Sequence, residues 1–292
     1  MTAQEIMAVV VSYNGGAGTV GAVEALAESV GHVHVVDNNS APDSRAILAR
    51  LGERPNVSVE YLPENRGIAH ALNRGVARAA ALGKSWVLTM DQDSRPDGKM
   101  IGAFCAMHDR HPENVCMSPR ICDHGELRPV KRQVLEYAIT SGNLVHLSVY
   151  ERIGLYHEDL FIDCVDIDFS LRVRKGGMSI HLVEDAILFH AVGEPTPGRA
   201  PIKFYTAHSR LRRYYLFRNS VYILRKHAFS FPGFSLKLLV SSSILFSSLP
   251  FYEKGVFKTY QWIFDGLFDG VVGNYGPKNN YHHPDSKCWI EP

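Results

Sequence analysis

The chain lacks the cysteine patterns that build zinc sites and disulfide frameworks. Its five cysteines include no C-x-x-C pair, and their number is odd. Because both kinds of site depend on paired cysteines at set spacings, neither is expected here. Reduced thiols are typical of a cytoplasmic protein, which is the location that the sequence predicts. The cysteines are Cys105, Cys116, Cys122, Cys164 and Cys288.

Long apolar runs and a strong net charge are also missing. The first seven residues hold no basic region followed by an apolar core, so we expect no signal peptide. The most apolar stretch, residues 234–251, is interrupted by one lysine, six serines and one proline. It falls short of the roughly 20 apolar residues of a membrane helix, so we expect no membrane span. The net charge of +1 gives no indication of nucleic-acid binding.

What is present is the composition of an ordinary globular protein. Hydrophobic residues make up 46% of the 292 residues and charged residues 21%, which allows one large α/β domain with an appendage. In the first 120 residues, short apolar segments alternate with helix-like segments, and this predicts a mostly parallel sheet with helices on both faces. We expect strands at residues 6–13, 32–37, 57–62 and 86–90, and helices at residues 22–30, 43–51 and 68–82.

The pattern becomes less regular beyond residue 120. It predicts a hairpin at 123–129, a helix at 169–174 and two further strands at 180–183 and 186–189. A segment with three prolines, residues 193–201, reads as a loop or linker. We therefore expect an α/β domain over residues 1–198 and a helical, basic and aromatic region over residues 199–292.

Polar turns follow several of the predicted strands. They lie at residues 12–14, 37–40 and 91–93, and a fourth polar segment, residues 64–67, precedes a helix. In open α/β sheets, ligands bind beyond the carboxyl ends of the strands. The four segments are therefore expected to converge on one edge of the sheet.

The strongest local signal is Asp91-Gln92-Asp93. Two carboxylates two residues apart, just past a buried strand, can turn toward one ion. Mg²⁺ and Mn²⁺ prefer oxygen ligands, and substrate phosphates often complete their coordination. The alternative is a solvated turn, because Asp, Gln and Ser are also common turn residues.

These segments together resemble the inverting glycosyltransferases of family 2, which have the GT-A fold, over roughly residues 6–195. Ser12, Tyr13 and Asn14 end a strand that is similar to the family's first nucleotide-contacting segment. Asp37 and Asn38 match the second segment, in which the Asp reads the base or the ribose. Asn65-Arg66-Gly67 resembles the family's N-x-G segment near the donor, and Asp91-Gln92-Asp93 occupies the D-x-D position.

The details resemble the rhamnosyltransferase branch of that family. The resemblance is carried by Asp91-Gln92-Asp93-Ser94, by Phe161-Ile162-Asp163 with Asp166, and by Tyr214-Tyr215 with Arg218-Asn219. It implies dTDP-L-rhamnose as the donor and an inverting transfer to a saccharide in surface polysaccharide synthesis. UDP- or GDP-linked sugars are the alternative donors.

An inverting transfer needs a general base that takes the proton from the acceptor hydroxyl. The family usually has an E-D-x-D/E pattern at the start of a helix, and the matching residues here are Val165, Asp166, Ile167 and Asp168. The first acid is therefore missing. We expect Asp166 to be the base, with Asp163 as the second candidate. Asp168 is expected to cap the helix and to favour its dipole.

Three other residues carry weaker expectations. His190 ends a predicted strand, and the resemblance implies that it completes the metal site; a structural hydrogen bond is the alternative. Ser141 and Gly142 fit a donor or acceptor loop, where glycine permits close backbone approach. An ordinary turn explains that segment equally well.

The C-terminal region is basic and aromatic. Residues 199–226 hold eight Lys and Arg and no acidic residue. Such a surface suits a polyprenyl-diphosphate-linked acceptor, and Arg218 is expected to approach the donor diphosphate, because Arg binds phosphate in a bidentate way. Residues 231–268 alternate apolar runs with lysines, which is typical of helices that lie on a membrane surface. A helical subdomain or a homodimer interface are the alternatives.

Two other functions fit parts of the pattern. A nucleotidyltransferase also joins an α/β sheet to metal-binding acids, but here the loop after the first strand, residues 12–16, has no Lys or Arg nearby. A non-catalytic protein that binds a nucleotide sugar would be consistent with Val165 at the position of the missing acid.

Overall fold

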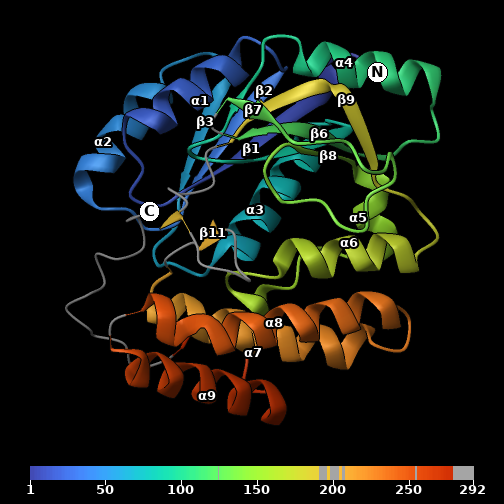
Figure 1. The fold of residues 1–292 in the computed structure, drawn as a ribbon. Helices are drawn as coiled ribbons and strands as arrows, with labels where there is room; N and C mark the ends of the chain where they lie inside the picture. Colours follow the sequence, from blue (N-terminus) through green and yellow to red (C-terminus); the bar gives the residue numbers. More distant parts are fainter. Residues whose placement is uncertain (124, 191–195, 198–203, 206–207, 254, 279–292) are drawn as a thin grey trace. The chain divides into compact units, whose positions relative to one another are not determined.

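The computed structural model describes residues 1–123, 125–190, 196–197, 204–205, 208–253 and 255–278 (Figure 1). The chain divides into two compact units. The first consists of Met1–Glu158 and Val165–Ala191, and the second of Asp159–Cys164 and Val192–Pro292. The short segment Asp159–Cys164 thus belongs with the C-terminal unit, which the sequence pattern does not suggest.

The first half of the sheet follows the predicted strands closely. It contains four parallel strands in the order β3-β2-β1-β4. Their segments are rich in buried Val and Ile, which favour the pleated, enclosed surface of a central strand. The bounds are β1 Ile6–Ser12, β2 His32–Asp37, β3 Val57–Tyr61 and β4 Trp86–Asp91.

The second half of the sheet is mixed rather than parallel. β8 (Asn143–His146) runs antiparallel to β4 and to β6 (Cys116–Asp123), and β6 runs parallel to β9 (His181–Phe189). The short strands β5 (Arg95–Pro96) and β7 (Glu126–Leu127) pair antiparallel with β9 and β6. Six of the nine strands (β1, β2, β3, β4, β6 and β9) nevertheless run in one direction, so the sheet is mostly parallel as expected, and β5, β7 and β8 run the other way. The prediction missed β6 and divided β9 in two, because exposed Glu184 and Asp185 interrupt its apolar pattern.

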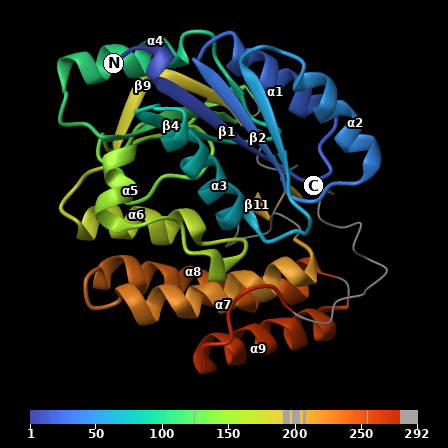
Figure 2. The same ribbon diagram turned by 180° about the vertical axis from the view of Figure 1, so that it is seen from behind.

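Helices cover both faces of this sheet (Figures 1 and 2). Ile6, Ala8 and Val10 of β1 belong to a core that also includes residues of α1 (Ala17–Ala27), α2 (Pro42–Leu51) and α4 (Met100–Arg110). Val9, which points to the opposite face, packs on Gly75 of α3 (Ile68–Ala81) so closely that a side chain at Gly75 has no room. The sequence did not predict α4.

Two more helices of the first unit matter for the site. α5 (Leu147–Ile153) follows β8, and α6 (Val165–Lys175) begins four residues before its expected start. Asp166 and Asp168 consequently lie within the first turn of α6 rather than ahead of it.

The second unit is built on three helices: α7 (Arg210–His227), α8 (Pro232–Tyr252) and α9 (Val256–Val272). Phe217 of α7, Leu249 of α8 and Ile263 of α9 form its small core. Contrary to the interpretation of its sequence, α8 is long and apolar enough to cross a membrane, as judged from length and composition alone; it is the one such helix in the described part of the chain.

Candidate active site

The ends of β1 and β4 are joined by the side chain of Gln92. Its carboxamide oxygen accepts a hydrogen bond from the backbone N–H of Tyr13 at 2.9 Å and from the Ser12 hydroxyl at 3.2 Å. Its amide nitrogen, Nε2, donates to the carbonyl of Tyr13 at 3.2 Å. Gln92 therefore fixes the first polar turn beside the Asp91–Asp93 turn.

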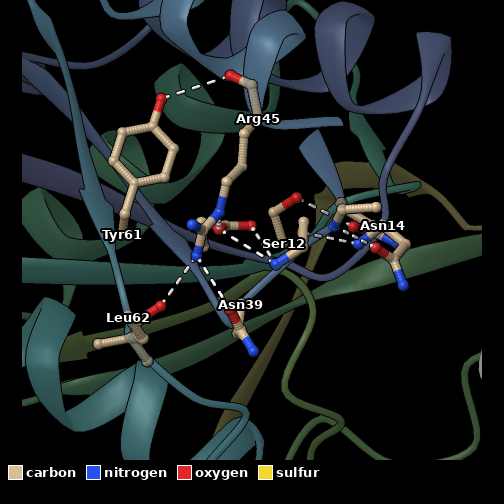
Figure 3. A network of polar contacts seen from close by, with 10 residues as sticks. Ser12, Asn14, Asn39, Arg45, Tyr61 and Leu62 are labelled. Atoms are coloured by element: carbon tan, nitrogen blue, oxygen red, sulfur yellow. Dashed lines mark hydrogen bonds and ion pairs between the residues drawn. The ribbon is translucent and has the colours of Figure 1, made fainter. Parts of the chain in front are cut away.

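Asp37 at the end of β2 is fully buried and ion-paired with Arg45, whose contacts Figure 3 shows. Its carboxylate accepts from Nε of Arg45 at 2.9 Å and from the backbone N–H of Ser40. The Arg45 guanidinium also donates to the Asn39 side chain and to the carbonyl of Leu62. This network holds the turn after β2 against the end of β3.

Two asparagines connect the turn after β2 to the segment before α3. Nδ2 of Asn38 donates to Oδ1 of Asn65 at 2.9 Å, and Oδ1 of Asn38 accepts from the backbone N–H of Arg66 at 3.1 Å. Oδ1 of Asn65 also accepts from the N–H of Gly67, whose φ of 86° favours glycine. The backbone N–H of Asn14 donates to the Ser40 hydroxyl at 2.8 Å, so all four expected polar segments share one hydrogen-bonded edge.

Asp91, Asp93 and His190 come together at this edge. One possible ligand atom from each lies within 4.8 Å of the others. Two ligands on opposite sides of one Mg²⁺ would be about 4.2 Å apart, so small side-chain rotations bring this set within reach of a single cation. Two carboxylates and an imidazole suit Mg²⁺ or Mn²⁺, and the residues therefore fit such an ion.

Ser94 orients the imidazole of His190. Its hydroxyl lies 2.5 Å from Nδ1 of His190, and the His190 backbone N–H donates to the carbonyl of Cys122. With Nδ1 occupied, Nε2 is the nitrogen that can bind a metal. Burial lowers the pKa of His190, although Asp93 opposes this shift, so the neutral imidazole that a metal requires is favoured.

Ser141 and Gly142 support the Asp91 turn from below. The Ser141 hydroxyl accepts from the backbone N–H of Asp91 at 3.3 Å, and the N–H of Gly142 donates to the carbonyl of Thr89 at 2.7 Å. Gly142 has a φ of 81°, and a Cβ there would lie 2.5 Å from Cγ of Pro119. Glycine is therefore required at this position because the backbone approaches Pro119, and the expected approach to a donor or acceptor stays a prediction.

The acids at the start of α6 have different environments. Oδ1 of Asp166 accepts from the N–H of Ile167, and the residue is partly exposed. Asp168 is only 1% exposed and pairs with Nε of Arg172 at 2.7 Å. Asp168 does not cap the helix, because α6 begins at Val165 and Arg172 holds the Asp168 carboxylate. It does lie in the first turn of α6, where a negative charge favours the helix dipole as expected.

Asp163 lies in the second unit, on a loop with unusual backbone geometry. Phe161, Asp163 and Cys164 all have φ values near the left-handed region, at 62°, 61° and 61°. Such values cost about 1–3 kcal/mol for each non-glycine residue unless surrounding contacts enforce them. The Arg212 guanidinium binds the Asp163 carboxylate at 3.2 Å. Burial raises the pKa of Asp163, and Arg212 opposes this shift.

Comparison with known proteins identifies the family. The family model described as glycosyl transferase family 2 matches residues 7–162, which is more than half of the chain. This chain belongs to glycosyl transferase family 2. The glycosyltransferase is 29% identical over 243 residues to the dTDP-rhamnosyl transferase RfbF of Shigella flexneri, covering 76% of this chain and 80% of that protein.

Solved structures share the fold of the glycosyltransferase. TarS 1-349 of S. aureus in complex with UDP-GlcNAc superposes with a TM-score of 0.65 at 17% identity, covering 93% of this chain and 81% of that one. GalNAc-T7 with UDP, GalNAc and Mn²⁺ gives a TM-score of 0.58 at 12% identity, covering 75% and 47%. The chain spans 40% of another S. aureus TarS chain. These similarities confirm the GT-A fold.

Arg218 of the glycosyltransferase has surroundings that do not match its expected role on the donor diphosphate. It is 1% exposed, and its guanidinium donates to the carbonyls of Asp159, Leu160 and Gly276. The ring of Tyr215 lies 4.7 Å from the guanidinium carbon. Because its donors are directed to backbone carbonyls, Arg218 holds the loop that carries Asp163.

Sequence reasoning missed Arg45, and it named Ser94 and Asn219 only as part of the rhamnosyltransferase resemblance, without the contacts that they make. Arg45 lies eight residues after Asp37, on a helix, and nothing in the sequence indicates which acid it meets. Ser94 directly follows the D-x-D turn, so its position in the motif could have predicted a contact with a metal ligand such as His190. Asn219 is fully buried and donates to three carbonyls of the Asp163 loop.

Proposed function

We propose that this glycosyltransferase moves L-rhamnose from dTDP-L-rhamnose to a saccharide acceptor, with inversion and with Mg²⁺ or Mn²⁺. The observation that carries the proposal is the set formed by Asp91, Asp93 and His190 beside the hydrogen-bonded turns after β1 and β2. The similarity to a dTDP-rhamnosyl transferase supports the choice of donor. A UDP- or GDP-linked sugar is the alternative, and binding without turnover is a second.

The turns at the sheet edge would bind the nucleotide. Ser12, Tyr13 and Asn14 would contact it from the end of β1, and Asp37 with Asn38 from the end of β2. Because the Asp37 carboxylate is paired with Arg45 and the Asn38 side chain is bonded to Asn65 and Arg66, both would shape the turn that lines the nucleotide. Asn65, Arg66 and Gly67 would line the donor from the segment before α3.

Asp91, Asp93 and His190 would hold the cation, with Gln92 and Ser141 fixing the turn. When bound, the cation would offset the negative charge that develops on the leaving diphosphate. Ser94 would keep His190 in the tautomer with Nε2 available. The acceptor hydroxyl would give its proton to the Asp166 carboxylate while its oxygen bonds to the anomeric carbon, and the nucleoside diphosphate leaves with the electron pair of the broken bond.

Asp163 is the second candidate for the base. Its carboxylate is paired with Arg212, which supports a role in orienting the acceptor rather than in taking the proton. A polyprenyl-diphosphate-linked saccharide is the acceptor class that we propose, in surface polysaccharide synthesis on the cytoplasmic face of the plasma membrane. The basic residues of the second unit support that choice.

Donor selection and metal dependence test the proposal. Purified protein is offered dTDP-rhamnose, UDP-glucose, UDP-N-acetylglucosamine and GDP-mannose with Mn²⁺, with Mg²⁺ or with chelator. The double variant Asp91→Ala, Asp93→Ala is compared with Asp185→Ala, which removes an exposed carboxylate from β9. We expect metal-dependent use of dTDP-rhamnose that only the double variant loses. Selection of another donor would refute the rhamnosyl assignment, and binding of a donor with no turnover on any acceptor would favour the non-catalytic alternative.

The two candidate bases are separated by Asp166→Asn and Asp163→Asn. We expect Asp166→Asn to slow the transfer step at saturating donor by about 10²–10⁴-fold, the usual contribution of a general base. Donor affinity should change little, since Asp166 acts on the acceptor. Equal rates for Asp166→Asn and wild type would remove Asp166 from this role.

A further inference from the structure

α9 packs with its small residues inward. Thr259, Gly266 and Gly270 are buried, and a Cβ on Gly266 would lie 2.5 Å from the carbonyl oxygen of Tyr214 on α7. At Gly270 the corresponding distance to the carbonyl oxygen of Arg218 is 2.8 Å. The backbones of α7 and α9 therefore approach so closely that side chains larger than hydrogen are excluded at these points.

Three phenylalanines of α9 lie on the side of the helix opposite its small buried residues. Phe257, Phe264 and Phe268 are 84%, 57% and 66% exposed. Their spacing of seven and four residues places them on one side of the helix. A soluble helix normally buries such residues and exposes its small and polar ones. α9 buries Ile263 but leaves these three phenylalanines exposed, which indicates that something apolar covers this side.

α8 extends the same kind of surface. Leu236, Val240 and Ile244 recur every fourth residue, and all three are exposed. The ring of Phe264 lies 5.9 Å from that of Phe246 on α8, so the exposed side of α9 borders α8. We call the six residues Leu236, Val240, Ile244, Phe257, Phe264 and Phe268 the exposed apolar face. Each of the two neighbouring helices thus exposes three large apolar side chains, and exposed apolar surface of this extent marks an interaction site.

The exposed charge of this unit indicates its partner. Residues 210–272 hold nine Lys and Arg against three Asp and Glu, but Arg213 and Arg218 are buried and Arg212 pairs with Asp163. Among the described residues of this range, the other exposed bases are Arg225, Lys226, Lys237 and Lys258, against one exposed acid, Asp265. The three acids already have partners: Glu253 pairs with Arg213, Asp269 accepts from the Tyr214 hydroxyl, and Asp265 pairs with Lys278. A second copy of the chain would bring the same excess of positive charge. Anionic lipid headgroups complement it, and lipid tails match the apolar side chains.

We propose that α8 and α9 form a docking surface for an anionic lipid membrane, with the exposed apolar face entering the headgroup boundary. The helices lie on the membrane rather than cross it. The buried side of α8 packs on α7 and α9 through Leu249, and α8 itself carries six serines and Lys237. Such a surface would bring the enzyme to a lipid-linked acceptor, and this consequence rests on the proposed function. Binding to the membrane itself does not depend on that function.

Co-flotation of the full chain with vesicles tests the surface. Vesicles of phosphatidylcholine with and without phosphatidylglycerol are compared at low and high salt. The test variant carries Phe257→Ser, Phe264→Ser and Phe268→Ser, and the control is Leu155→Ser, an exposed leucine of the first unit. We expect salt-sensitive binding to the anionic vesicles, weakened roughly ten-fold or more for each phenylalanine that enters the lipid, and unchanged in the control.

Several results would overturn the inference. Equal binding by wild type and the triple variant, or none by either, would show that the face does not meet lipid. A lipid-free dimer in sedimentation velocity that the triple variant abolishes would identify a second copy as the partner. Resistance to both high salt and alkaline carbonate would indicate that α8 spans the bilayer. Transfer from dTDP-rhamnose to a water-soluble acceptor is measured in the same variants. Because this reaction needs no membrane, its rate tests the proposed function, and vesicle binding tests the docking surface.

Discussion

The Asn219 side chain sets the shape of the loop that carries Asp163, and its replacement by leucine tests this role. Nδ2 of Asn219 donates to the carbonyls of Leu160, Ile162 and Asp163 at 2.8, 2.7 and 2.9 Å. Leucine is similar in size, so Asn219→Leu fills the space without these donors. Asn219 and Leu160 are both fully buried, so water has no direct route to the Leu160 carbonyl, whereas the carbonyls of Ile162 and Asp163 are partly buried.

The structure gives the magnitude. A buried polar group left without a partner costs about 1–3 kcal/mol, and two amide hydrogens shared among three carbonyls correspond to roughly 2–5 kcal/mol. The backbone strain of the three left-handed residues in the loop has a similar or larger energy, about 1–3 kcal/mol each. Because the two quantities are comparable, we expect the loop to relax while the helices stay folded. A displacement of about 1 Å at Asp163 then lowers the transfer rate roughly 100-fold.

The assay combines thermal unfolding with single-turnover transfer at saturating donor. The matched control is Ser220→Ala, since that hydroxyl is also buried on α7 but donates within its own helix, to the carbonyl of Leu216. We expect the transfer rate of Asn219→Leu to fall while donor affinity is kept, and Ser220→Ala to behave like wild type. Loss of stability with an unchanged transfer rate would refute the link between loop shape and chemistry. No loss of either would refute the reasoning on the carbonyls themselves.

Three further predictions concern the first unit and Asp163. Arg45→Met leaves the buried Asp37 carboxylate without its cation, and we expect the free energy of unfolding to fall by about 2–3 kcal/mol. The loss is smaller than for a fully buried pair because Arg45 is partly exposed. Urea unfolding measures it, and Arg54→Met, which breaks an exposed pair with Glu24, is the control. Gly142→Ala should lower the free energy of unfolding by roughly 1–3 kcal/mol more than Gly154→Ala does. Both residues have φ above 80°, but only at Gly142 would the added Cβ meet a neighbour, Pro119. Equal melting temperatures of the two variants would contradict this. Burial raises the pKa of Asp163, so the folded state favours its protonated form, and this contribution is present below the ordinary pKa and lost as pH rises through the raised pKa. We therefore expect Asp163→Asn to gain unfolding free energy relative to wild type as pH rises from the ordinary aspartate pKa of about 4 through the raised one, and a difference that does not vary with pH would contradict this.

The amino-acid sequence by itself determined much of the first half of the fold. The strand at residues 32–37 has the predicted bounds, because its apolar run ends sharply at the polar turn after Asp37. The parallel order also follows from the alternation of strands and helices. Asp91 and Asp93 could be proposed as metal ligands for the same reason, since two carboxylates at a strand end are a local feature.

Residues that meet over long separations were decided by the tertiary structure. His190 reaches Ser94 across 96 residues, and Asn219 reaches Leu160 across 59. Arg218 shows why the sequence is insufficient: an arginine in a basic segment reads as a phosphate ligand, and only its burial against three carbonyls gives it a different part. Local patterns report propensity and periodicity, whereas the partner of a buried polar group depends on which distant backbone the fold brings within hydrogen-bonding distance.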